Sequence, residues 1–166
     1  MKRIFAIVTA LVLSLSLCVT AHAADGGIID AAGLMSGADQ NALQQEAQAI
    51  SEQYDIAVYA ITVDDYQEFT DGEIEDAADY FYGGLMEENA ILLMLSMYDR
   101  DYLLIAYGDA AQYAFNDEGR EYLADYFLDD FSNDDWYYGF SDYISWCGEF
   151  MEAAENGEPF PAQTSP

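Results

Sequence analysis

Basic residues are scarce in this chain of 166 residues, which has 4 Lys and Arg against 32 Asp and Glu, together with one His and two Cys. The His, one of the Cys and half of the basic residues lie within the first 23 positions. The remaining 143 residues contain Arg100, Arg120 and Cys147 but no Lys or His, and they carry a net charge of −30. This excludes a Ser-His-Asp triad, a His or Cys zinc site, a P-loop lysine and a pyridoxal-phosphate lysine from that part.

The charge also restricts the class of partner. Binding to nucleic acid or to anionic lipid requires a basic patch, and a surface this acidic repels phosphate groups. Divalent cations and basic proteins of the envelope or the secreted space remain as the natural partners. Most of the carboxylates are expected to be solvated surface groups.

The N-terminus has the three parts of a secretory signal peptide. Lys2 and Arg3 precede an apolar run from Ile4 to Val19, and Ala21-His22-Ala23 follows as an A-x-A cleavage site. We therefore expect residues 1–23 to be removed and the protein to be exported, to the cell envelope or beyond it. No second apolar segment of spanning length follows, so no transmembrane segment is expected in the mature chain.

Hydrophobic periodicity predicts one α/β domain over residues 24–154 and a flexible tail over 155–166. About half of the residues are apolar, enough for one core. Continuous apolar runs indicate buried strands, and i, i+3, i+4 spacing indicates helices. The predicted order is helix from 36, strand 56–63, helix 74–85, strands 90–97 and 102–107, helix from 116 and helix from about 134.

The lengths of the connections predict the topology. The first two strands are joined through a helix and should be parallel, whereas the link between the second and third permits only a hairpin. The result is an α/β fold, a three-layer α/β/α sandwich with a small mixed sheet, Rossmann-like in plan.

Asp64 and Asp99 follow the first two predicted strands, Asp30 lies just before the first predicted helix, and together they suggest a metal site. Ligands of open α/β sheets bind at the carboxyl ends of the parallel strands. Asp30, Asp64 and Asp99 should meet there, with Asp117 supplied by a helix start and Arg100 as an anion or salt-bridge partner. Oxygen-only ligands suit calcium or magnesium. The alternative is that these are turn residues with no ligand.

The remaining cysteine, Cys147, shares a predicted helical stripe with Ile144 and Met151. No Lys or His is available to lower the pKa of its thiol. We therefore expect a buried structural thiol and not a nucleophile.

Four stretches resemble, in order, the landmarks of a known family. They are Ile29–Ser36, Glu88–Leu95, Asp99-Arg100 followed by Tyr107-Gly108, and Asn116-Asp117. This set is similar to the TPM domain, whose members include a thylakoid-lumen protein of photosystem II repair, receptor modulators and exported bacterial proteins. The resemblance covers about residues 27–153. It departs at Ala90, where the family usually has Gly.

The resemblance implies a compact α/β/α sandwich outside the cytoplasm, divalent-cation binding and, for plant members, acid phosphatase activity. Asp30, Asp99, Arg100 and Asp117 occupy family landmarks, whereas Asp64 comes from the topology alone. Two functions follow. The first is a non-catalytic, cation-binding accessory or interaction module of the envelope or secreted space. The alternative is a weak metal-dependent acid phosphatase acting on phosphomonoesters, whose catalytic residues the sequence does not identify.

Overall fold

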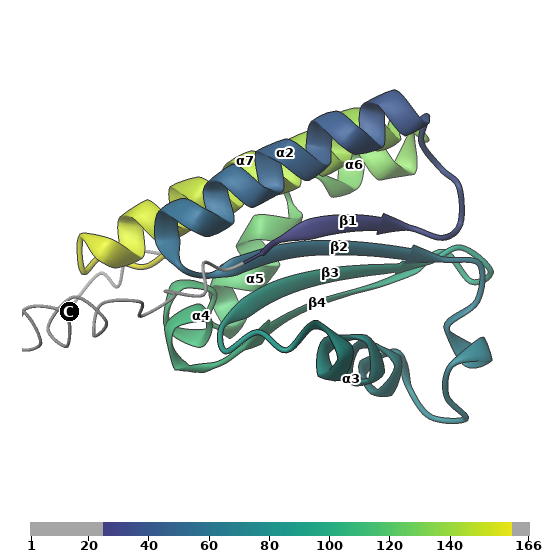
Figure 1. Ribbon diagram of the computed structural model, residues 1–166, viewed down its shortest axis with the longest axis horizontal. Helices are drawn as coiled ribbons and strands as arrows, with labels where there is room; N and C mark the ends of the chain where they lie inside the picture. The colour runs from purple at the N-terminus through teal and green to yellow at the C-terminus, as the bar shows by residue number, and fades with distance from the viewer. Residues whose placement is uncertain (1–24, 161–166) are drawn as a thin grey trace, which may run out of the picture.

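A computed structural model describes residues 25–160, which form one mixed sheet with helices on both faces (Figure 1). The signal peptide predicted for residues 1–23 lies outside the described residues. The elements are β1 (Gly27–Asp30), α2 (Gly37–Tyr54), β2 (Ala57–Val63), the short 3₁₀ helix η1 (Tyr66–Glu68), α3 (Ile74–Leu85), β3 (Ala90–Ser96), β4 (Asp101–Tyr107), α4 (Asp109–Ala114), α5 (Asp117–Ala124), α6 (Leu128–Ser132) and α7 (Trp136–Glu155).

The sheet has the order β1-β2-β3-β4. The first three strands are parallel, and β4 is antiparallel to β3. The predicted crossover between β2 and β3 and the predicted hairpin between β3 and β4 are both confirmed. The hairpin turn, Met97–Arg100, holds Arg100 in the left-handed region, at φ 52°.

Successive residues of the strands face two different cores, because side chains alternate across a strand. One core lies between the sheet and the layer of α2 and α7, with α4, α5 and α6 at its margins; the other lies under α3. Figure 1 shows α2 and α7 side by side on one face and α3 on the other. The three-layer α/β/α sandwich predicted from the sequence is therefore confirmed.

The helix predicted from residue 36 is present as α2. Ser36 is its N-cap and accepts a hydrogen bond from the backbone N–H of Asp39, as residues with short polar side chains do at helix starts. Leu43 and Ala47, which are spaced four residues apart along this helix, are fully buried. The apolar periodicity therefore indicated the packed face of this helix.

The sequence reasoning missed β1, the first edge strand. It has only four residues and no long apolar run. Its pairing with β2 depends on tertiary contacts: the backbone N–H of Ile28 donates to Gln44 Oε1 of α2 at 2.7 Å. Gly26 comes so close to β2 that a Cβ there would lie 2.6 Å from Val58 O. Such contacts leave no periodic signal in the sequence.

One predicted helix is divided in two. Leu123, Phe127 and Phe131 are spaced four residues apart, as in the one helix predicted from residue 116, but α5 ends at Ala124 and α6 begins at Leu128. All three side chains are buried. Phe127 packs edge-on against Tyr143 of α7, with ring centroids 5.6 Å apart. The break allows the chain to turn while these rings stay in the core.

The last helix, α7, buries the predicted stripe. Cys147 is fully buried, as expected, and burial raises the pKa of its thiol well above the ordinary value. Next to it, the hydroxyl of Tyr143 donates to the carbonyl of Tyr59 at 3.0 Å, so α7 is attached to β2 by a buried hydrogen bond. Over residues 25–160, no helix combines the length and the apolar content needed to cross a membrane.

Candidate functional site at the carboxyl edge of the sheet

Three loops meet where the parallel strands end, as the topology predicts. The backbone N–H of Ala31 donates to Thr62 O at 3.0 Å, which joins the ends of β1 and β2. The N–H groups of Met97 and Tyr98 donate to Val63 O at 3.0 Å and Asp64 O at 2.7 Å, which joins the ends of β2 and β3. This edge therefore contains Asp30, Asp64 and Asp99.

Asp30 is occupied by contacts within the protein. Its Oδ1 accepts from the backbone N–H of Leu34 at 3.0 Å and from the hydroxyl of Thr62 at 2.5 Å, and its Oδ2 accepts from the N–H of Met35 at 2.9 Å. Both oxygens thus hold the loop between β1 and α2 closed against β2. This carboxylate is a structural group, and a metal ion bound to it would have to compete with three hydrogen bonds.

Asp64 and Asp99 lie on neighbouring loops, and both side chains are exposed. Asp65, next to Asp64, accepts from the backbone N–H of Gln67 at 2.9 Å and caps η1. The Oγ of Ser96, which is buried, accepts from the N–H of Tyr66 at 3.0 Å. The polar groups that hold these loops are therefore used to build turns.

The structure places Asp117 beside β4, away from the loops that follow β1 and β2, which corrects the predicted grouping. Because β4 runs antiparallel to β3, the chain returns to the end where the parallel strands begin. Asn116 there accepts from the backbone N–H of Gly119 at 2.9 Å and caps α5, and Asp117 forms an ion pair with Arg120 at 2.9 Å. The strand before Asp117 is antiparallel to the others, so the chain does not bring this helix start to the carboxyl ends of the parallel strands.

The residues of the predicted metal site therefore do not fit one coordination sphere. Across the part of the chain that the structure describes, no group of three or more acidic, His or Cys side chains could hold a metal ion. Asp30 is engaged by three donors at the end of β1, whereas Asp117 lies beside β4, the outer strand on the other side of the sheet. These two carboxylates cannot share one ion in this fold.

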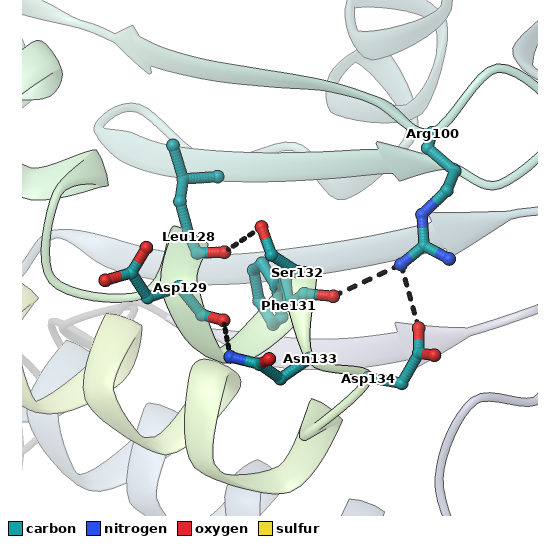
Figure 2. Close-up of polar contacts among 7 residues, drawn as sticks. All are labelled: Arg100, Leu128, Asp129, Phe131, Ser132, Asn133 and Asp134. Atoms are coloured by element: carbon teal, nitrogen blue, oxygen red, sulfur yellow. Dashed lines mark hydrogen bonds and ion pairs between the residues drawn. The ribbon is translucent and has the colours of Figure 1, made fainter.

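Arg100 lies at the carboxyl edge and contacts the region of α6 and α7 (Figure 2). Its Nη2 donates to Asp134 Oδ1 at 2.8 Å and to the carbonyl of Phe131 at 3.2 Å, and its guanidinium lies 5.7 Å from the centre of the Trp136 ring. Figure 2 also shows the Ser132 hydroxyl donating to the Leu128 carbonyl, at 2.8 Å. The sequence predicts Arg100 as an anion or salt-bridge partner, and in the structure its partner is Asp134. The Arg100 side chain is 54% exposed.

The hollow beside Arg100 is small. It has a volume of about 100 Å³ and is lined by Arg100, Asp101, Tyr102, Ser132 and Trp136, among others. Small-molecule sites usually enclose about 300–1,000 Å³. This hollow is therefore too small to enclose an organic phosphomonoester.

Larger hollows lie along the outer edge of β4, which the sequence reasoning did not single out. Two open hollows of about 700 and 510 Å³ are lined by residues of β4 and α5 and share Asp117 and Arg120. Burial raises the pKa of Tyr102 in this region, and Asp125, Asp101 and Glu121 raise it further. In the sequence, this region is indicated only by the predicted hairpin, which places β4 at the margin of the sheet.

Comparison with known proteins identifies the family. The TPM domain model matches residues 28–149. No curated protein matches the chain. Similar solved structures include the N-terminal domain of a protein from P. gingivalis, with 19% identity, a TM-score of 0.61, and coverage of 76% of this chain and 82% of that one. The N-terminal domain of the cg2496 protein from Corynebacterium glutamicum has 13% identity, a TM-score of 0.59, and coverage of 85% and 90%.

A third similar structure is that of the BA42 protein from the psychrophilic bacterium Bizionia argentinensis, with 15% identity, a TM-score of 0.53, and coverage of 78% of this chain and 86% of that one. At these identities the likeness concerns the fold alone. The family model covers most of the described residues. The chain therefore belongs to the TPM domain family.

Proposed function

We propose that this protein is an exported, non-catalytic accessory or interaction module that binds cationic partners in the cell envelope or the secreted space. Export is inferred from the signal-peptide pattern of residues 1–23. The cationic partner is inferred from the charge of the folded part. Basic segments of other proteins are the partners that this charge favours, with calcium and magnesium as counterions of the same surface.

The observation that supports this proposal is that both arginines of residues 25–160 are already paired. Arg100 contacts Asp134 and Arg120 contacts Asp117. The other acids have no basic side chain within the domain to offset them, because the mature sequence holds 32 acids and two arginines. A surface potential of this sign accelerates association with cations and suppresses association with anions.

The alternative is a weak metal-dependent acid phosphatase. Its basis is the family resemblance of Asp99-Arg100, a carboxylate next to a guanidinium at the carboxyl edge. Such chemistry needs charge stabilisation of the phosphoryl oxygens. Arg100 would have to exchange its 2.8 Å contact with Asp134 for the substrate, next to a hollow of about 100 Å³. The geometry therefore supports the binding module better.

Two measurements test the proposal together. Binding of a lysine-rich peptide should be measurable by calorimetry at low salt and should weaken steeply as salt rises, whereas a glutamate-rich peptide of equal length should not bind. Turnover of a generic phosphomonoester, at acid and neutral pH with calcium or magnesium, should equal that of the Asp99→Asn variant. Turnover that is present in the wild type and lost in the variant would make the enzyme the better account.

A further inference from the structure

The two outer strands of the sheet, β1 and β4, differ in whether their free backbone groups are hydrogen-bonded. The outer edge of β1 is closed by side chains of α2. Gln44 accepts from the N–H of Ile28 at 2.7 Å and donates to the carbonyl of Gly26 at 3.2 Å, and Gln40 donates to the carbonyl of Ile28 at 3.2 Å. These glutamines take the place of a neighbouring strand, so this edge offers few free backbone groups to a partner.

The register shows which backbone groups of β4 face away from the sheet. Asn89 and Met97, at odd positions flanking β3, bond toward β2: Asn89 O accepts from Ala57 N, and Met97 N donates to Val63 O. The even positions of β3 therefore bond to β4, where their partners are odd residues, as in the pair Leu92 and Ile105. The backbone groups of the even β4 residues consequently point outward. These residues are Tyr102, Leu104 and Ala106.

Only the two ends of this row have partners. The N–H of Tyr102 donates to Asp101 Oδ1 at 2.8 Å, and the carbonyl of Ala106 accepts from Gln112 Nε2 at 3.5 Å. Both contacts agree with the outward direction that the register requires. Between them, and counting only residues 25–160 as partners, the carbonyl of Tyr102, both groups of Leu104 and the N–H of Ala106 make no hydrogen bond within the protein.

A groove runs along this row. The hollow of about 700 Å³ is lined by Ile105 and Ala106 and faces Gln112 and Glu118; that of about 510 Å³ is lined by Tyr102, Leu103 and Leu104 and faces Glu121. Both are lined by Asp117 and Arg120, so the two hollows adjoin each other beside β4 and α5, and together they are called the β4 groove. An added strand lies about 4.8 Å from its neighbour and advances about 3.3 Å per residue. The β4 groove follows five consecutive residues of β4, from Tyr102 to Ala106, so its length corresponds to that of a short extended segment.

The charges of the β4 groove select the segment. Asp117, Glu118 and Glu121 line it and are exposed. Its one base, Arg120, is held by Asp117 at 2.9 Å and by the carbonyl of Phe115 at 2.8 Å. A second copy of this chain would bring a net charge of −30 to the same edge, which opposes pairing of two β4 strands.

We propose that the β4 groove is the docking site for an extended, basic segment of a partner protein, which binds as a fifth strand of the sheet. Its main chain hydrogen-bonds with the free groups of Tyr102, Leu104 and Ala106, and its Lys or Arg side chains meet the acids of α5. This inference rests on the proposed function and adds to it the place and the conformation of the basic partner.

A pair of peptides tests the inference on the whole mature chain. The first alternates Lys and Val over seven residues. The second has the same sequence and charge but carries N-methyl groups on alternate residues, so that one of its edges cannot donate hydrogen bonds. The first should bind at least about 10-fold more tightly. On its binding, the backbone amide signals of Leu104 and Ala106 should shift in nuclear magnetic resonance spectra, and their hydrogen exchange should slow.

Variants of equal charge locate the effect on the protein. The double variant Glu118→Gln and Glu121→Gln should bind the first peptide more weakly than the control Glu46→Gln and Glu75→Gln, whose side chains are exposed on α2 and α3. If both peptides bind equally, or both variants bind the first peptide equally, docking in the β4 groove is refuted, and only a diffuse attraction to cations remains. Failure of any lysine-rich peptide to bind would refute the proposed function itself. Concentration-dependent dimers that shift the Leu104 signal without peptide would assign the edge to a second copy.

Discussion

Replacing Asp30 by Asn should destabilise the fold without altering the response to calcium. The carboxylate accepts three hydrogen bonds, from Leu34 N, Met35 N and the Thr62 hydroxyl. An amide has one oxygen, so Asn satisfies at most one of the two backbone donors and presents an N–H₂ group to the other. A hydrogen bond to a charged group contributes about 1.5–3 kcal/mol, and an unsatisfied buried donor costs about 1–3 kcal/mol. The expected loss in the free energy of unfolding is therefore about 2–4 kcal/mol.

The assay is urea denaturation, followed by circular dichroism, with and without calcium. Asp71→Asn is the matched control, because Asp71 is exposed in the loop before α3; its effect should stay within about 0.5 kcal/mol. Thr62→Val removes the hydroxyl that donates to Asp30 and that also accepts from the backbone N–H of Ala32 at 3.2 Å, so this variant should destabilise the fold as well. Monovalent salt at matched ionic strength controls for screening of the acidic surface.

The calcium arm separates the structural role from the metal-ligand role first expected for Asp30. At about 100 times its dissociation constant, a ligand adds about 2.7 kcal/mol to the stability of the protein it binds. If Asp30 were a ligand, that gain would disappear in Asp30→Asn. The structure predicts the same calcium response in the wild type and the variant. A variant as stable as the wild type, or one that has lost a calcium effect present in the wild type, would refute this assignment.

Three further predictions concern other parts of the fold. Gly108→Ala should lower the free energy of unfolding by about 2 kcal/mol or more in urea denaturation, because Gly108 has φ +83° and a Cβ there would collide with the carbonyl of Glu88. Cys147 should react with a thiol reagent only as fast as the protein unfolds, and rapid labelling of the native protein would contradict its burial. Burial, and then the charge of Asp130, raise the pKa of Asp142 in the folded state. The folded state thus holds this proton more tightly, and the contribution of Asp142 to stability falls as pH rises through that pKa. Asp142→Asn should stabilise the protein at pH 7 by about 0.5 kcal/mol or less and have no effect at pH 3, and a gain at both pH values would contradict the linkage.

The sequence predicted the elements that carry their own periodic signal. The run of β2 and the stripe of α2 are apparent without any knowledge of the neighbours, because burial on both faces gives a continuous run and burial on one face gives a 3.6-residue period. The strand β1 depends on Gln44 and on the close approach of Gly26, and neither is a local property. The break between α5 and α6 likewise follows from the packing of Phe127 against Tyr143.

The site was predicted less completely than the fold, for a topological reason. The meeting of Asp64 and Asp99 at one edge follows from the parallel strands, and Asp30 is expected there because the first predicted helix begins over the same edge. Asp117 is expected with them from a helix start and a family landmark, although the predicted hairpin makes the strand before it antiparallel and so carries it away from the carboxyl ends. Hydrogen bonds decide the rest: Thr62, which the sequence reasoning did not single out, donates to Asp30 and makes that acid part of the scaffold.

The landmark residues of the TPM family serve the fold in this chain. Asp30 closes a loop, and Asn89 Oδ1 accepts from the N–H of Ala110 at 3.0 Å at the start of α4. Gly108 has a positive φ at the end of β4, and Asn116 caps α5 while its Nδ2 donates to the carbonyl of Phe160 at 3.1 Å. These positions lie at turns and helix starts, where only a few residue types fit. Their similarity to the family therefore explains a shared fold more directly than it supports a shared chemistry.

Function then has to be sought in groups that the scaffold leaves free. At the carboxyl edge, Asp30 and Arg100 are each satisfied by at least two contacts within the domain. Along β4, in contrast, the outward groups of Leu104 have no partner among the described residues, whereas the corresponding edge of β1 is closed by Gln40 and Gln44. An unpaired strand edge is a hazard that proteins usually cover or blunt with charge. Acids next to this edge repel another copy of the same chain and attract a basic strand. The same residues therefore disfavour self-association and favour binding of a basic partner.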